Sequence, residues 1–221
     1  MDQSNLSWKE YIKNLDHFPS GKAPWEKEFI KAVLENVPKG EVKKVLEVGC
    51  SNGRFLRWFH KQYNCVCFGI DNDSTGFRQD GEIEFKLADA RSLPYKDSSF
   101  DLVFSLGLIE HFPKEERYIL LKEQSRVLKK GRYLICQVPL LSFSLNFLYT
   151  KLVYDFRKGI RHFRVTEREI KNYLLGLDFQ IIYNSRLGLP FETKFFEKLS
   201  RVRQVKRILA TEVLIIGRKT K

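Results

Sequence analysis

The chain has 221 residues, of which 43% are hydrophobic and 14% aromatic. This length and composition predict one folded domain with a buried core, and they exclude a disordered chain, a collagen-like repeat and a small disulfide-stapled protein. Lys and Arg number 39 against 27 Asp and Glu, which gives a formal net charge of +12.

The excess positive charge lies almost entirely in the last third of the chain. Residues 1–150 hold 22 basic and 20 acidic side chains, whereas residues 151–221 hold 17 basic and 7 acidic ones, a net of +10. This balance favours an anionic partner near that end, such as a nucleic acid, a phosphorylated substrate or a membrane surface. A basic surface that is only solvated explains the charge equally well.

The cysteine pattern predicts reduced thiols in a cytoplasmic protein. No two cysteines have the two-residue spacing of a zinc knuckle, and we expect no metal site. The first residues lack the basic and then apolar pattern of a signal peptide. The longest uncharged stretch, 133–150, contains too many polar residues for a membrane span. The four cysteines are Cys50, Cys65, Cys67 and Cys136.

Predicted elements begin with a polar arm over 1–24 and a helix over 25–36. Short apolar strands then alternate with helices. Strands are predicted at 44–48, 66–70, 84–87, 100–106 and 133–138, and helices at 53–63 and 114–128, the latter stopped by Lys130 and Gly131. This alternation is typical of an α/β fold whose parallel sheet is covered by helices on both faces.

The pattern changes after residue 139. Residues 140–165 form an insertion that is apolar first and basic later. A helix follows over 166–175, with Thr166 as N-cap and Glu169 at the capping-box position. Two further strands are predicted at 179–183 and 212–216. Between them, residues 194–209 have the spacing of a helix with one apolar face and one basic face.

The stretch VLEVGCSNGRFL, residues 45–56, is the most informative for chemistry. An apolar strand runs into a turn that contains Gly49 and Gly53, and then into a helix whose first N–H groups are free to bind a ligand. In doubly wound folds, nucleotides bind at such a turn.

Acidic residues stand at the ends of three consecutive predicted strands: Glu47, Asp71 and Asp89. Asp71 lies 18 residues after Gly53, where a carboxylate can accept hydrogen bonds from both hydroxyls of a ribose. The turn has neither a P-loop pattern nor the full dinucleotide pattern, and Glu47 would repel a pyrophosphate. A nucleoside with a cationic tail fits these residues better than a dinucleotide.

At this point the sequence resembles the class I S-adenosylmethionine-dependent methyltransferases. The resemblance covers about residues 42–139 and is closest to the small-molecule, type 11 branch that includes ubiquinone and menaquinone methyltransferases. Ser51 stands where that family usually has a glycine. The segments that carry the resemblance are VLEVGCSNGRFL, FGID, LADARSLPYKDSSFDLVFSLGLIEHF, RVLKKGRYLICQVP and HFRVTEREIKNYLLGLDFQI.

The resemblance implies a single domain over 1–221 with a doubly wound, Rossmann-like, mostly parallel sheet of seven strands, in the order 3-2-1-4-5-7-6 with strand 7 antiparallel. It also implies S-adenosylmethionine as cofactor. The methionine end would be shaped by Glu47, Gly49, Cys50, Ser51 and Gly53. The ribose would be held by Asp71 beside Asn72, the adenine by Asp89 and Ala90, and the amino group by the carbonyl of Ser105.

The methyl acceptor stays open at this stage. The apolar part of the insertion, 140–154, favours a small or lipid-like acceptor, whereas the basic last third favours RNA or an anionic membrane surface. A non-catalytic relative that only binds the cofactor is a third possibility. His111 is the candidate general base, needed only if the nucleophile must lose a proton. Alternatively, Glu110 and His111 only close the pocket, and Tyr154 and His162 are weaker candidates for acceptor contacts.

Overall fold

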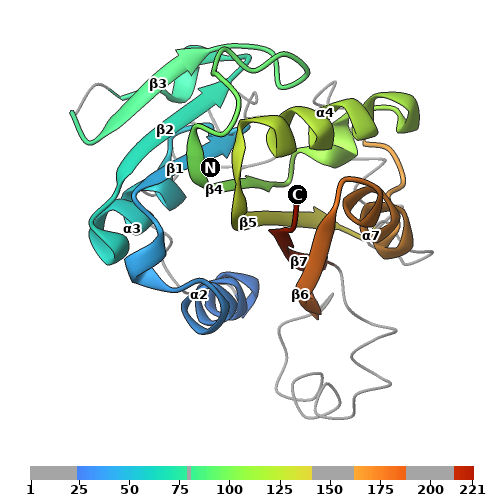
Figure 1. Ribbon diagram of the computed structural model, residues 1–221. Coiled ribbons are helices and arrows are strands. Elements are labelled where there is room, and N and C mark those ends of the chain that lie inside the picture. Colours follow the sequence, from blue (N-terminus) through green and yellow to red (C-terminus); the bar gives the residue numbers. More distant parts are fainter. Residues whose placement is uncertain (1–23, 79–80, 141–161, 188–211) are drawn as a thin grey trace.

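The fold is a seven-stranded sheet in the order β3-β2-β1-β4-β5-β7-β6 (Figure 1), seen in a computed structural model. The structure describes residues 24–78, 81–140, 162–187 and 212–221. This order confirms the doubly wound, Rossmann-like architecture expected from the sequence. The N-terminal arm, most of the insertion and the basic segment 194–209 lie outside the described residues, so the assignment of 1–221 to one domain stays a prediction.

Four parallel strands form the first half of the sheet. They are β1 (Lys44–Val48), β2 (Val66–Asp71), β3 (Ile83–Leu87) and β4 (Phe100–Leu106). Val48 of β1 is paired with Ile70 of β2, and Asp71 of β2 with Leu87 of β3. These strands therefore end at one common edge of the sheet, which is where the loops that follow them gather.

The second half is built from β5 (Leu128–Pro139), β6 (Phe179–Leu187) and β7 (Glu212–Lys219). β5 is parallel to β4, and β7 runs antiparallel to both β5 and β6. An antiparallel strand starts where its parallel neighbours end. The first residue of β7, Glu212, therefore pairs with Pro139, the last residue of β5.

Several predicted boundaries differ from the observed ones. The strands predicted at 179–183 and 212–216 continue to residues 187 and 219, and the largest difference lies where α4 meets β5. The sequence predicted a helix to residue 128, a stop at Lys130 and Gly131, and a strand from 133. Instead α4 (Lys114–Val127) passes directly into β5 at Leu128. The strand continues through Gly131, which has a φ of +76°, and its pairing with β4 shifts between Phe100 and Leu102. A glycine that tolerates positive φ was thus part of an irregular strand and did not end it.

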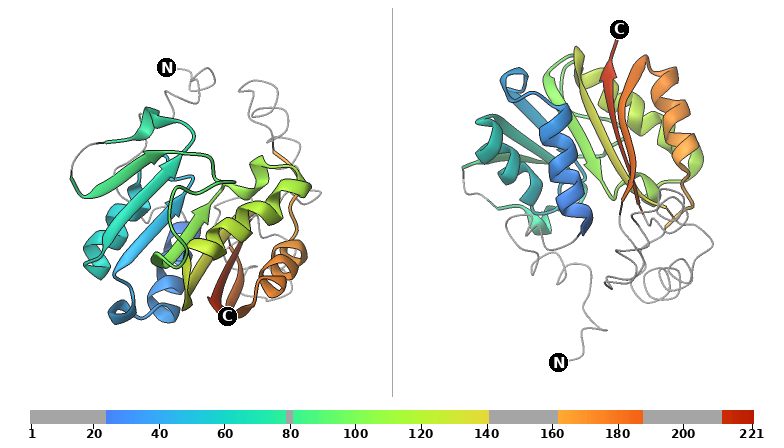
Figure 2. Two further views of the ribbon diagram at one scale, coloured as in Figure 1. Left: turned by 45° about the horizontal axis from the view of Figure 1, so that its top comes forward. Right: turned by 90° about the horizontal axis from the view of Figure 1, so that it is seen from below.

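Helices cover both faces of the sheet (Figure 2). On one face lie α2 (Pro24–Asn36) and α3 (Arg54–Tyr63), and on the other lie α4 and α7 (Glu167–Gly176). The strand side chains alternate between the two cores. Val45 packs with the α2 and α3 residues, and Leu46 with those of α4 and α7. Burial on both faces explains why the β1 sequence is almost continuously apolar.

Three short 3-10 helices complete the described structure: η2 (Lys39–Glu41), η3 (Ser74–Gly76) and η4 (Ile109–His111). The predicted N-cap of α7 is confirmed, since the Thr166 side chain accepts a hydrogen bond from the Glu169 N–H at 3.2 Å. Among the helices in these described ranges, none is long and apolar enough to cross a membrane.

Candidate active site

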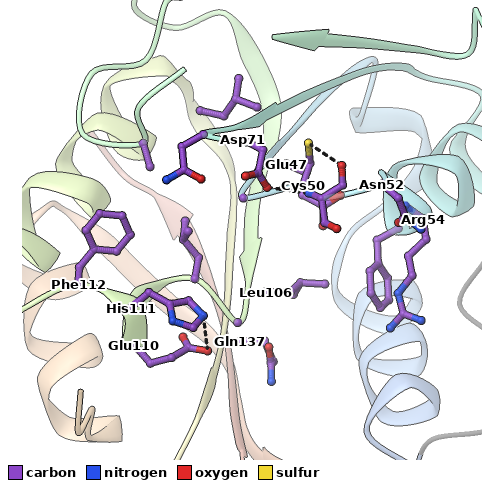
Figure 3. Close-up of a pocket in the computed structure, with 18 of the residues that line it drawn as sticks. Glu47, Cys50, Asn52, Arg54, Asp71, Leu106, Glu110, His111, Phe112 and Gln137 are labelled. Carbon is purple, nitrogen blue, oxygen red and sulfur yellow. Dashed lines mark hydrogen bonds and ion pairs between the residues drawn. The ribbon is translucent and has the colours of Figure 1, made fainter. Parts of the chain in front are cut away.

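A pocket of about 780 Å³ opens at the edge where β1, β2 and β4 end (Figure 3). Its walls come from the loops that follow β1 to β4, from η4, and from the last residues of β5. Glu212 of β7 and Trp25 of α2 complete the lining. Doubly wound sheets bind ligands at this edge.

The loop after β1 is held tightly against its neighbours. The N–H groups of Gly49 and Cys50 both donate to the carbonyl of Ile70, at 2.8 and 2.9 Å. Gly49 has a φ of +78° and faces the pocket. Gly53 also has a positive φ, of +70°, but a Cβ there would lie 2.8 Å from the Phe85 ring. Gly53 is therefore required for helix–strand packing and does not line the pocket.

Asp71 joins the loops after β1 and β2. Its Oδ2 accepts from the Ser51 N–H at 2.8 Å, and its Oδ1 accepts from the Asp73 N–H at 3.1 Å. Burial raises the pKa of Asp71, although these backbone hydrogen bonds oppose the shift. Each carboxylate oxygen keeps a further lone pair for a ligand. Asn72 lines the pocket beside it.

Glu47 is a buried carboxylate that faces the pocket, with 3% of its surface exposed. Its Oε2 has no hydrogen-bond partner among the described residues. Burial raises the pKa of Glu47 well above its ordinary value, and Arg54 opposes this shift. Arg54 is itself bonded to Glu26 at 2.6 Å. A buried carboxylate with an unused oxygen fits a ligand that brings a positive charge or an N–H group.

Asp89 is held by a neighbour. Arg91 donates to both of its oxygens, with Nη2 at 2.6 Å from Oδ2 and Nε at 3.0 Å from Oδ1. Arg91 also reaches Glu116 on α4 at 2.8 Å. The Arg91 hydrogen bonds lower the pKa of Asp89, which is half exposed at the pocket mouth. Ala90, next to it, is buried in the pocket wall.

The structure gathers most of the predicted site residues in this one pocket, but two lie elsewhere. Ser105 is fully buried within β4, and Leu106 and Gly107 line the pocket in its place. Gly53, as described above, faces β3. The predicted residues that line the pocket are Glu47, Gly49, Cys50, Ser51, Asp71, Asn72, Asp89, Ala90 and His111.

A second group of polar side chains lines the pocket beyond Leu106. Glu110 has 3% of its surface exposed, and burial raises its pKa to about 8. Glu212, whose pKa burial raises to about 7, accepts from Gln137 Nε2 at 2.7 Å. His111 Nε2 lies 3.9 Å from Glu110 Oε1. Figure 3 shows Glu110, His111 and Gln137 grouped across the hollow from Glu47 and Asp71.

The end of the insertion is attached to this second group. The Phe163 N–H donates to the Glu110 carbonyl at 2.7 Å, and the rings of His111 and His162 pack with centroids 4.7 Å apart. Arg117 of α4, which is buried, donates to the carbonyls of Phe112 and Arg164 at 2.9 and 3.0 Å. Through these contacts, residues 162–164 hold η4 in position.

Sequence reasoning missed several lining residues, above all Glu212 and Gln137. Both residues belong to strands that the sequence predicted. The predicted strand order, with strand 7 antiparallel, was enough to place them at this edge. Because β7 is antiparallel to β5, its first residue had to lie at the ligand-binding edge. Trp25, Asn52 and Arg54 also line the pocket without having been singled out. Within the described ranges, no group of three or more His, Cys, Asp or Glu side chains is arranged to hold a metal ion.

Comparisons with known proteins agree with this geometry. Residues 46–136 match a family profile described as a methyltransferase domain, of type 11. The chain is 34% identical over 125 residues to a tRNA (carboxymethyluridine(34)-5-O)-methyltransferase of Xenopus tropicalis, covering 56% of this chain and 19% of that protein. It is 28% identical over 113 residues to the chloroplastic tocopherol O-methyltransferase of Arabidopsis thaliana, covering 47% and 32%. The chain thus spans less than two fifths of the curated relatives it matches first.

Solved structures share the fold at low identity. A SAM-dependent methyltransferase from Archaeoglobus fulgidus has a TM-score of 0.64 and 21% identity, over 87% of this chain and 94% of that one. A geranyl diphosphate C-methyltransferase from Streptomyces coelicolor, crystallised with S-adenosyl-L-homocysteine, has a TM-score of 0.67 and 12% identity, over 88% and 78%. S-adenosylmethionine is the cofactor of this family. Residues 46–136 thus match the type 11 methyltransferase domain, and they lie in a sheet whose fold is shared with solved S-adenosylmethionine-dependent methyltransferases.

Proposed function

We propose that this protein transfers a methyl group from S-adenosylmethionine to a small organic acceptor bound in the same pocket. The observation that carries the proposal is the division of one pocket into two polar groups. Glu47 and Asp71 stand on one side and Glu110 and Gln137 on the other (Figure 3), and Gln137 donates a hydrogen bond to Glu212. A volume of about 780 Å³ lies in the upper part of the range that small-molecule sites occupy.

The residues of the first group fit the cofactor. Asp71 would accept hydrogen bonds from the ribose hydroxyls, with Asn72 beside it. The unused oxygen of Glu47 suits the amino group of the methionine end, and Gly49, Cys50 and Ser51 form the backbone that passes close to it. Asp89 and Ala90 would contact the adenine. When bound, S-adenosylmethionine supplies a methyl group that is already activated for transfer.

The protein's own contribution is positioning and the exclusion of water. The second group would hold the acceptor, and the predicted insertion 140–165, of which the structure describes residues 140 and 162–165, would line the acceptor site. His111 faces the pocket and could accept a proton from an acceptor that must lose one. That role depends on which atom is methylated, and it stays a proposal.

Calorimetric titration with S-adenosyl-L-homocysteine, followed by a methyl-transfer assay with labelled S-adenosylmethionine, tests the proposal. We expect one equivalent of the product to bind and labelled methyl to appear in small-molecule extracts. Binding without transfer to any acceptor would support the third possibility, a non-catalytic relative. Absence of binding by folded protein would contradict the proposal altogether.

RNA is the second candidate acceptor, and two observations favour it. Several relatives carry tRNA methyltransferase names, and residues 151–221 hold a net charge of +10. The same charge suits an anionic membrane surface. Reversal of Arg201, Arg203 and Lys206 to Glu, in the segment outside the described residues, should weaken binding to RNA or to anionic vesicles at low salt. If the unaltered protein binds neither, the basic segment is only a solvated surface.

A further inference from the structure

The pocket lining includes a buried carboxylate, that of Glu110, with one oxygen that no described residue binds. Glu110 is 3% exposed and lines the pocket, yet its Oε2 has no hydrogen-bond partner. Leaving a buried polar atom unpaired is costly, so an unpaired oxygen that lines a pocket is a site where a ligand can donate a hydrogen bond. Figure 3 shows the side chain beside His111 and Gln137 at the hollow.

A second carboxylate lies close enough to affect it. Glu212, at the start of β7, also lines the pocket, and its negative charge contributes to the raised pKa of Glu110. Glu28 of α2 in turn contributes to the raised pKa of Glu212. No described Lys or Arg lines this end of the pocket. Arg54 is bonded to Glu26, and Arg91 to Asp89 and Glu116.

We propose that Glu110 and Glu212 form the acceptor subsite and that they recognise a primary or secondary amine, bound as its ammonium ion. Because an ammonium nitrogen has no lone pair, it would give one proton to Glu110 or Glu212 before it attacks the methyl group, whose bond to the cofactor sulfur then breaks. An ammonium group brings up to three N–H donors and a positive charge, which matches an unpaired buried oxygen and two neighbouring carboxylates. The lining of the same pocket includes the apolar side chains of Trp25, Leu108 and Phe112. This inference rests on the proposed function and names the chemical class of its acceptor.

The charge balance argues against the other acceptor classes. A carboxylate or phosphorylated acceptor would meet Glu110 and Glu212 with the same sign of charge, and Arg117, the described cation whose charge acts on Glu110, is already paired with Glu169 at 2.8 Å. A neutral alcohol or phenol offers one donor for the unpaired oxygen and leaves the second carboxylate without compensation. Burial raises the pKa values of Glu110 and Glu212 to about 8 and about 7, so both groups carry protons near neutral pH that a bound cation would displace. A bound cation would hold both groups ionised.

The test uses three ligands with one carbon skeleton and different charge: phenethylamine, 2-phenylethanol and phenylacetate. Each is titrated into the full-length protein saturated with S-adenosyl-L-homocysteine, which removes the cofactor half of the pocket from competition. We expect the amine to bind at least tenfold more tightly than the alcohol, with no measurable binding of phenylacetate. Amine binding should also release protons, seen as a binding enthalpy that changes with the buffer.

Two variants test whether Glu110 and Glu212 cause the preference for the amine over the alcohol. Glu110→Gln and Glu212→Gln keep the side-chain shape and remove the charge, so each should reduce the preference for the amine over the alcohol by tenfold or more. The matched control is Glu35→Gln, which removes an exposed carboxylate on α2 that lies 3.8 Å from Lys31 Nζ. Circular dichroism and retained binding of the cofactor product verify that each variant is folded.

The outcomes separate this inference from the proposed function. If S-adenosyl-L-homocysteine does not bind, the proposed function fails, and the amine inference, which rests on it, fails with it. If it binds and phenylacetate or 2-phenylethanol then binds as well as the amine, the methyltransferase assignment stands and the amine inference is wrong. An amine preference that persists in the Glu110→Gln/Glu212→Gln double variant would also overturn the inference.

Discussion

The carboxylate of Asp71 accepts a hydrogen bond from the Ser51 N–H at 2.8 Å, and this contact joins the loop after β2 to the loop after β1. The other oxygen of Asp71 accepts from the Asp73 N–H at 3.1 Å. One side chain therefore shapes both loops before a ligand binds. Such preorganisation lowers the entropic cost of binding.

Replacing Asp71 by Ala should weaken binding of S-adenosyl-L-homocysteine by roughly 1–3 kcal/mol, because ribose hydroxyls would lose their acceptor and two loop N–H groups would lose theirs. Calorimetry measures the affinity, and thermal unfolding without ligand measures the separate effect on the loops. Asp97→Ala, which removes an exposed carboxylate bonded to Arg126, is the control. Unchanged affinity in Asp71→Ala would rule out the ribose assignment.

Gly76 lies against the backbone of the cofactor loop. A Cβ at this position would be 2.7 Å from the Ser51 carbonyl carbon and 2.9 Å from the Asn52 nitrogen. Because backbone atoms cannot move aside as a side-chain end can, Gly76→Ala should displace the loop and weaken product binding at least tenfold. Gly176→Ala is the matched control, since no atom lies within 4 Å of a Cβ there. Equal affinities in the two variants would show that the loop position is unimportant.

Ser51 adopts a φ of +48°, a left-handed conformation that favours glycine. Ser51→Gly should therefore change the free energy of unfolding by less than about 1 kcal/mol, because relief of strain and added unfolded-state entropy oppose each other. Ser51→Val should destabilise the protein by roughly 1–3 kcal/mol, since a β-branched residue is strained at positive φ. Denaturant unfolding of both variants checks this, and equal stabilities would count against the backbone argument.

Glu110 should make stability depend on pH. Its folded pKa is raised from 4.5 to about 8, by burial first and by Glu212, with Arg117 opposing. The stabilisation that this group contributes is therefore complete below about pH 4.5 and is lost as the pH rises through 8. Glu110→Gln cannot ionise, so its unfolding free energy should fall less over that range, with a difference of roughly 1–4 kcal/mol at the alkaline end.

Denaturant unfolding at a series of pH values measures this slope. Glu212, whose pKa is also raised, contributes a slope of the same sign that remains in the variant. Glu35→Gln again serves as the exposed control. A variant whose pH profile coincides with that of the unaltered protein would show that Glu110 does not titrate in this range.

The sheet could be predicted because each strand carries its own signal. Strands buried on both faces read as short apolar runs, and the acidic residues that end β1 and β2 marked one side of the pocket. The residues on the other side of the pocket could not be predicted from such local patterns. Glu212 and Gln137 become neighbours only through the antiparallel pairing of β7 with β5, and no local pattern encodes that contact.

Glycines were the weakest signals. Gly49, Gly53 and Gly131 all have positive φ, yet only Gly49 lines the pocket. Gly53 packs under Phe85, and Gly131 lies inside β5. A glycine in a sequence indicates a position with positive φ or with no room for a Cβ atom. Which neighbouring residue leaves no room is known only from the fold.

A crystal structure of the complex with S-adenosyl-L-homocysteine tests the central claim most directly. The account predicts the ribose hydroxyls on the carboxylate of Asp71, the adenine beside Asp89 and Ala90, and the sulfur facing the side of the pocket that holds Glu110. A ligand bound in the reverse orientation, or away from the loops that follow β1 and β2, would contradict it.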